Sequence, residues 1–73
     1  MLETVLAAYR QGLENPDVGP TDDFFEVGGD SVQALNVLAI LEEKIGVNVN
    51  IGVFFACPTA AELATAIQNS ETD

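Results

Sequence analysis

Basic residues are almost absent from this chain. Its 73 residues include two Lys or Arg, 12 Asp or Glu and no His, which gives a formal net charge of −10 at pH 7. With so few cations to neutralise phosphates, this charge nearly excludes a nucleic-acid partner. Without histidine, the chain also lacks the usual general base of a serine or cysteine hydrolase. The acidic surface favours basic protein partners, and it also keeps a small apolar domain in solution.

Cysteine and long apolar runs are scarce as well. The single cysteine, Cys57, rules out an internal disulfide framework and fits a reducing compartment. It has no second cysteine or histidine with which to form a metal site, so we interpret it as a small buried hydrophobic residue. No apolar run is long enough to span a membrane, and no basic segment precedes one as in a signal peptide. We therefore expect a cytoplasmic protein with no membrane contact.

What the chain does contain is helical periodicity. Apolar residues recur every three or four positions over residues 2–13 and again over 31–45, where Gly46 supplies a left-handed stop. Pro58 followed by the capping-box pair Thr59 and Glu62 predicts a last helix that reaches about residue 68, with a frayed polar tail over 69–73. The faces that we expect to be buried are Leu2, Val5, Leu6, Tyr9 and Leu13 in the first segment, and Ala34, Val37, Leu38, Leu41 and Ile45 in the second.

The connecting segments are less regular. Residues 14–30 form a loop that is long for a domain of this size, and such loops are more often functional than not. Residues 47–51 alternate like a strand, but an isolated strand cannot pair, so we expect an extended loop. Residues 52–56 predict a short helical turn, in which Phe54 and Phe55 are not both easily buried. The chain, 1–73, is therefore predicted to be a single all-α domain with a long first loop and a short third helix. An apolar content of 48% is enough for its core.

A serine ends the long loop in a distinctive setting. Gly28 and Gly29 permit a tight turn, Asp30 is a good N-cap, and Ser31 then falls at the first helical position. There its hydroxyl is exposed, and the free N–H groups of the helix end favour an attached phosphate. The carboxylates of this loop do not have the spacing of a calcium-binding EF-hand.

The stretch Asp-Asp-Phe-Phe-Glu-Val-Gly-Gly-Asp-Ser resembles the phosphopantetheine attachment motif of carrier proteins, and Gly-Gly-Asp-Ser is most similar to the form in peptidyl carrier proteins of non-ribosomal peptide synthesis. Phe55, Pro58-Thr59 and Glu62-Leu63-Ala64 extend the resemblance over nearly the whole chain. It implies a four-helix bundle in which Ser31 bears 4′-phosphopantetheine donated by coenzyme A. The thiol of this group would hold aminoacyl or peptidyl thioesters for antibiotic or related natural-product biosynthesis.

The resemblance also implies partners. They are a phosphopantetheinyl transferase, an adenylating enzyme or domain, and condensation or tailoring enzymes, all acting on a monomeric carrier that is not itself an enzyme. Asp30 and Gly29 would belong to the attachment site with Ser31. Apolar residues beside Ser31 on its helix lie off the expected buried face, and we interpret them as a docking patch. The patch consists of Val32, Leu35 and Ala39, with Phe54 and Phe55 as candidates to complete it and Gln33 and Asn36 at its rim.

Three alternatives remain at this point. In the first, the long loop or the third helix covers the patch residues, which then form no docking surface. In the second, the chain is an acyl carrier of fatty-acid or polyketide synthesis, although Gly-Gly before Asp30 and the low charge of residues 32–41 favour the peptidyl branch. In the third and more remote alternative, the chain is a small acidic helical adapter without a prosthetic group. Met1 directly before a helix suits a free-standing protein, and a domain cut from a larger synthetase would look the same.

Overall fold

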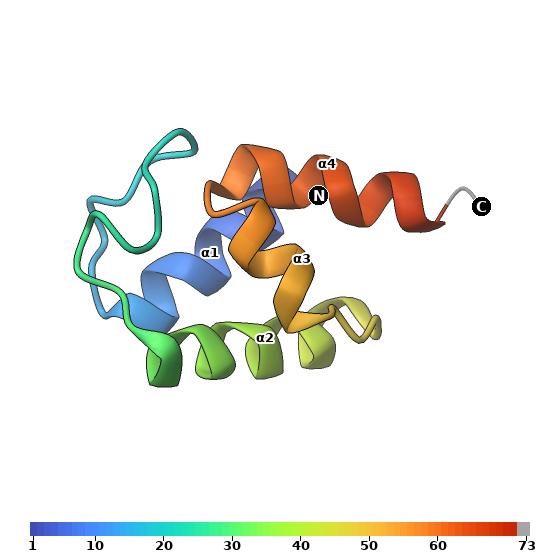
Figure 1. Ribbon diagram of the computed structural model, residues 1–73, viewed down its shortest axis with the longest axis horizontal. Coiled ribbons are helices and arrows are strands. Elements are labelled where there is room, and N and C mark those ends of the chain that lie inside the picture. Colours follow the sequence, from blue (N-terminus) through green and yellow to red (C-terminus); the bar gives the residue numbers. More distant parts are fainter. Residues whose placement is uncertain (72–73) are drawn as a thin grey trace.

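The computed structural model describes residues 1–71 and shows four helices over that range (Figure 1). They are α1 (Leu2–Leu13), α2 (Ser31–Ile45), α3 (Ile51–Ala56) and α4 (Ala60–Glu71). The described residues form no strand, and one isolated bridge joins Asp23 to Thr59. None of these helices is long and apolar enough to cross a membrane. The predicted all-α bundle, with its long first loop and short third helix, is confirmed.

The helix ends follow from local chemistry. Gly46 ends α2 in the left-handed conformation, with φ 70°, which glycine adopts without strain. Before α4, the Thr59 hydroxyl accepts the Glu62 N–H at 3.1 Å and donates to the Glu62 carboxylate at 2.8 Å. Both signals were predicted from the sequence. The predicted pairing of Thr59 with Glu62 therefore forms. The Glu62 carboxylate accepts the Thr59 hydroxyl, whereas in a capping box it would accept the Thr59 backbone N–H.

The last helix is longer than predicted. The sequence predicts an end near residue 68 and a frayed tail over 69–73, but α4 continues to Glu71. Gln68 and Asn69 are polar, and no glycine or proline stops the helix there. A polar run is compatible with a helical turn that faces solvent, so polarity alone was a poor stop signal. Residues 72–73 lie outside the described part of the chain.

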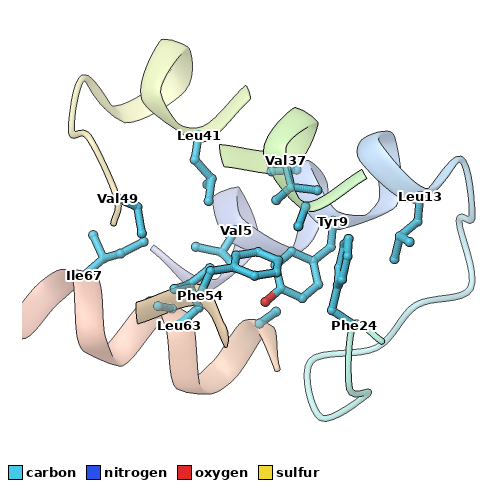
Figure 2. Close-up of a cluster of buried hydrophobic side chains, with 14 of the residues drawn as sticks. Val5, Tyr9, Leu13, Phe24, Val37, Leu41, Val49, Phe54, Leu63 and Ile67 are labelled. Atoms are coloured by element: carbon cyan, nitrogen blue, oxygen red, sulfur yellow. The ribbon is translucent and has the colours of Figure 1, made fainter. Parts of the chain in front are cut away.

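An aromatic cluster from three elements occupies the centre of the core (Figure 2). Tyr9 of α1, Phe24 of the first loop and Phe54 of α3 are each fully buried. Phe24 meets Tyr9 and Phe54 edge to face, with ring centroids 5.3 and 5.0 Å apart. Such contacts add about 0.5–1.5 kcal/mol beyond the burial of area. The aliphatic residues labelled around the rings come from α1, α2, α4 and the loop between α2 and α3: Val5, Leu13, Val37, Leu41, Val49, Leu63 and Ile67.

The predicted buried faces hold with one exception. Leu2 is exposed at the start of α1, whereas Leu6, Leu38 and Ile45 are partly buried and pack against the core. Helix α1 contacts both α2 and α4. Gly12 marks a close approach of α1 to α2, because a Cβ there would overlap a methyl group of Val37.

The long first loop is fastened to the junction between α3 and α4. The Phe24 N–H donates to the Pro58 carbonyl at 3.1 Å, and the Ala61 N–H donates to the Pro20 carbonyl at 3.0 Å. The Tyr9 hydroxyl donates to the same Pro58 carbonyl at 2.9 Å. The loop is therefore hydrogen-bonded to the α3–α4 junction and to α4, and α1 is bonded to the same junction carbonyl.

Candidate functional site

Ser31 is the first residue of α2, and its side chain is exposed. The extended residue before it, Asp30, is the N-cap: its carboxylate accepts the Gln33 N–H at 2.9 Å. In return, the Gln33 side-chain oxygen accepts the Asp30 N–H at 3.2 Å. This reciprocal capping box fixes where the helix starts. The predicted positions of Asp30 and Ser31 are confirmed, whereas Gln33, predicted at the rim of a docking patch, completes the cap.

The surroundings of Ser31 fit a phosphate ester. An α-helix begins with backbone N–H groups that have no acceptor inside the helix, and the positive end of its dipole favours an anion. The residues on either side of Ser31, Asp30 and Val32, are exposed as well, so the surface around the hydroxyl is open to solvent. The site therefore has an exposed hydroxyl, a favourable dipole and room for a bulky substituent.

The turn before Asp30 depends on two glycines in different ways. Gly28 has φ 102°, a conformation that residues with side chains rarely adopt. Gly29 instead lies directly against Phe24: its N–H donates to the Phe24 carbonyl at 3.0 Å. A Cβ on Gly29 would come within 2.6 Å of that carbonyl oxygen and would overlap the Phe24 ring. The backbone that leads to Ser31 is thus in contact with a buried aromatic side chain.

The apolar flank of α2 is exposed, as the docking interpretation requires. Val32 and Leu35 are 67% and 58% exposed, so neither the loop nor α3 covers them. Ala39 is exposed too, but it lines a groove between α1 and α2 together with Asn36 and Ile40. The predicted patch therefore extends around α2 from Leu35 toward α1.

The two aromatic residues of α3 have opposite environments. Phe54 is fully buried in the core, so its assignment to a docking surface is wrong; successive residues of a helix point about 100° apart, and only one of the pair faces inward. Phe55 is 49% exposed and stacks on Phe25, with ring centroids 5.4 Å apart and planes inclined by 21°. Ile51 and Val53 are also exposed on α3, which the sequence reasoning missed. A six-residue helix with one buried side chain leaves its other apolar residues at the surface.

Catalytic and metal chemistry find little support at this site. The chain has no histidine, and no group of three or more potential ligands among residues 1–71 is arranged to hold a metal ion.

Cys57 is a free, partly buried thiol, so the expected burial is incomplete. Burial raises the pKa of Tyr9, with a further contribution from the Asp23 carboxylate, and the protonated hydroxyl thus keeps its hydrogen bond to Pro58.

Comparison with known proteins is consistent with this geometry. Residues 4–67 match the family described as "Phosphopantetheine attachment site". A plipastatin synthase polypeptide of Bacillus subtilis is 40% identical over 72 residues, which cover 97% of this chain and 2% of that protein. Tyrocidine synthase 2 of Brevibacillus parabrevis is 36% identical over 67 residues, which cover 92% of this chain and 2% of that protein. The chain thus spans about 2% of the length of these relatives.

The fold has a close counterpart among solved structures. A type-II acyl carrier protein from Streptomyces verticillus, involved in bleomycin biosynthesis, superimposes with a TM-score of 0.89. The two sequences are 25% identical, and the match covers 94% of this chain and 83% of that chain. The expected small helical bundle is therefore shared with this carrier protein.

Proposed function

Because the chain belongs to the phosphopantetheine attachment family, whose members carry a covalent 4′-phosphopantetheine, we propose that Ser31 bears this group. The chain is a carrier domain of the kind found in non-ribosomal peptide synthetases, and other enzymes modify and load it. These findings confirm the family and the prosthetic group that the sequence predicts. The similarity to peptide synthases supports the peptidyl branch over an acyl carrier of fatty-acid or polyketide synthesis.

The observation that carries the assignment is the position of Ser31. Its exposed hydroxyl stands at the first residue of a helix whose start is fixed by Asp30 and Gln33. When bound, the prosthetic group supplies a thiol on a flexible arm, which holds the carried acid as a thioester. The chain's own residues present the hydroxyl at a defined point. We assign removal of the hydroxyl proton to the transferase, since this chain has no histidine and the neighbouring Asp30 carboxylate accepts the Gln33 N–H.

Carrier domains of this kind act with modifying, adenylating and condensing partners. For this chain we propose a phosphopantetheinyl transferase, an adenylating enzyme or domain, and downstream condensation or tailoring enzymes. The net charge of −10 supports partners with basic surfaces near the attachment site. The exposed side chains of Val32, Leu35 and Phe55 support apolar contacts beside that site.

The remaining expectations join this proposal. Residues 1–71 share one core, which supports a single carrier domain over 1–73. We place this domain in the cytoplasm, in keeping with its single free cysteine, and we expect it to act as a monomer. Neither assignment changes the proposed chemistry of Ser31.

A loading experiment tests the peptidyl assignment. The phosphopantetheinylated protein is incubated either with an adenylating enzyme of peptide synthesis, its amino acid and ATP, or with a malonyl transferase and malonyl-CoA. In the incubation with the adenylating enzyme, the intact mass should rise by one aminoacyl group. Hydroxylamine should remove this group, because it cleaves thioesters. The unmodified protein, whose only thiol is Cys57, is the control and should stay unloaded. Malonyl loading without aminoacyl loading would instead establish the acyl-carrier alternative.

A further inference from the structure

Phe24 connects the attachment turn to the core. Its side chain is fully buried, and its ring meets Tyr9, Phe25 and Phe54 edge to face, with centroids 5.3, 5.3 and 5.0 Å apart. Figure 2 shows the ring beside Tyr9 in the labelled core cluster. Its backbone is held as well, since the Phe24 N–H donates to the Pro58 carbonyl at 3.1 Å. Phe24 is thus fixed from several sides.

Phe24 also contacts the backbone of Gly29. The Phe24 carbonyl accepts the Gly29 N–H at 3.0 Å. The three atoms nearest to a Cβ placed on Gly29 all belong to Phe24, two from the ring and one from the carbonyl. Ser31 follows two residues later, after the N-cap Asp30. The Gly29 backbone, two residues before Ser31, therefore lies in direct contact with Phe24.

No partner enzyme reaches the Phe24 side chain, because it has no exposed surface. An influence of Phe24 on the modification of Ser31 must therefore pass through the backbone of this chain. Phe54 offers a matched comparison: it is equally buried in the same aromatic cluster, but it lies on α3 and contributes none of the three atoms nearest to Gly29.

We propose that Phe24 is a positioning residue for the modification of Ser31, acting through its contact with the Gly29 backbone. The inference rests on the proposed function, in which Ser31 is the acceptor of phosphopantetheine. In the transfer, the Ser31 hydroxyl oxygen forms a bond to the pantetheine-linked phosphorus of coenzyme A, the pyrophosphate bond at that phosphorus breaks, 3′,5′-ADP leaves and the hydroxyl proton passes to the transferase. The oxygen must lie in line with the breaking bond, and misplacement of a reacting atom by about 1 Å can cost about 100-fold in rate. A smaller side chain at Phe24 removes the surface against which Gly29 packs.

The test compares Phe24→Leu with Phe54→Leu in transfer kinetics with coenzyme A, magnesium and a permissive transferase, at a temperature where circular dichroism shows both variants folded. Phe24→Leu should lower kcat by roughly 10-fold or more, because Ser31 is misplaced. Its KM for the carrier should stay within about 2-fold of wild type, because the docking surface is unchanged. Phe54→Leu should keep both constants within about 2-fold of wild type.

A second pair of variants keeps every core aromatic in place. Gly29→Ala pushes a methyl group against Phe24 and should also lower kcat. Gly19→Ala adds a methyl group in the same loop, where its nearest neighbour is an Asp22 oxygen at an ordinary 3.4 Å, and should leave kcat unchanged. This pair decides the question if Phe24→Leu does not fold.

The outcomes separate the two proposals. Equal kcat values for the Phe24 and Phe54 variants, or a kcat for Gly29→Ala equal to that of wild type, would overturn the positioning role. The proposed function would still stand as long as the wild-type protein is modified at Ser31. A wild-type protein that accepts no phosphopantetheine would overturn both.

Discussion

The Tyr9 hydroxyl donates to the Pro58 carbonyl at 2.9 Å, across 49 residues of sequence. The same carbonyl accepts the Phe24 N–H at 3.1 Å. One carbonyl at the junction of α3 and α4 therefore binds both α1 and the loop that carries the attachment site. This arrangement gives Tyr9 a role in the stability of the site without any contact with Ser31.

Tyr9→Phe removes one of these two hydrogen bonds. The free energy of unfolding at neutral pH should fall by about 0.5–1.5 kcal/mol, because a net hydrogen bond is lost while the carbonyl keeps its second donor. Urea unfolding of the two proteins measures the difference. A variant as stable as wild type would show that the hydroxyl contributes nothing to the fold.

The same pair of proteins predicts a pH dependence. Burial raises the pKa of Tyr9 above its usual value near 10, so the folded protein keeps a proton that the unfolded chain releases. The stability linked to Tyr9 is therefore complete below about pH 10 and is lost as the pH rises further, by up to about 1.4 kcal/mol per pH unit. Wild type should lose stability faster than Tyr9→Phe above about pH 10. Parallel curves for the two proteins would contradict a raised pKa.

Asp30 caps α2 and also carries a negative charge, and two substitutions separate these two contributions. Asp30→Ala should lower the free energy of unfolding by about 0.5–2 kcal/mol, because the Gln33 N–H loses its acceptor. Asp30→Asn removes the charge but keeps a good capping side chain, so its stability should stay closer to wild type. If the Asn variant is as unstable as the Ala variant, capping is not what Asp30 contributes.

The charge of Asp30 should appear in the kinetics of modification. We expect Asp30→Asn to slow transfer by a phosphopantetheinyl transferase more at low salt than at high salt, because salt screens the attraction to a basic partner surface. The rates of wild type and variant are compared across a salt series. Rates that do not depend on salt in either protein would remove the electrostatic part of the account.

Leu35 and Leu41 lie on the same helix with opposite exposure. Leu35 is 58% exposed, whereas Leu41 is fully buried. Leu35→Ala should change the free energy of unfolding by less than about 0.5 kcal/mol and should slow loading by the adenylating partner. Leu41→Ala should cost about 2–5 kcal/mol and should leave loading normal at temperatures where it is folded. Normal loading of Leu35→Ala would remove Leu35 from the docking surface.

Much of the fold could be predicted because its signals are local. The periodicity of residues 2–13 and 31–45, the glycine stop at Gly46 and the N-cap at Asp30 depend on neighbouring residues, and the structure has them where the sequence predicts. The environments of Phe54 and Phe55 depend instead on how α3 is rotated against Tyr9 and Phe24. No local pattern in a six-residue helix specifies that rotation.

The candidate site divides in the same way. Ser31 and Asp30 were identified from the motif, and their positions at the helix start are confirmed. The side chain of Gln33 was assigned to a surface, although its spacing of three residues from Asp30 already fits a capping box. The contact of Gly29 with Phe24 was not foreseen, because the sequence does not show which ring packs against which turn.

The central claim is that Ser31 alone accepts phosphopantetheine, and intact-mass measurement tests it directly. The chain has two serines, so Ser70→Ala serves as the matched control for Ser31→Ala. After incubation with coenzyme A, magnesium and a permissive transferase, wild type and Ser70→Ala should each gain the mass of one phosphopantetheine group. Ser31→Ala should stay folded and gain none. A phosphopantetheine adduct on Ser31→Ala, or none on wild type, would contradict the account.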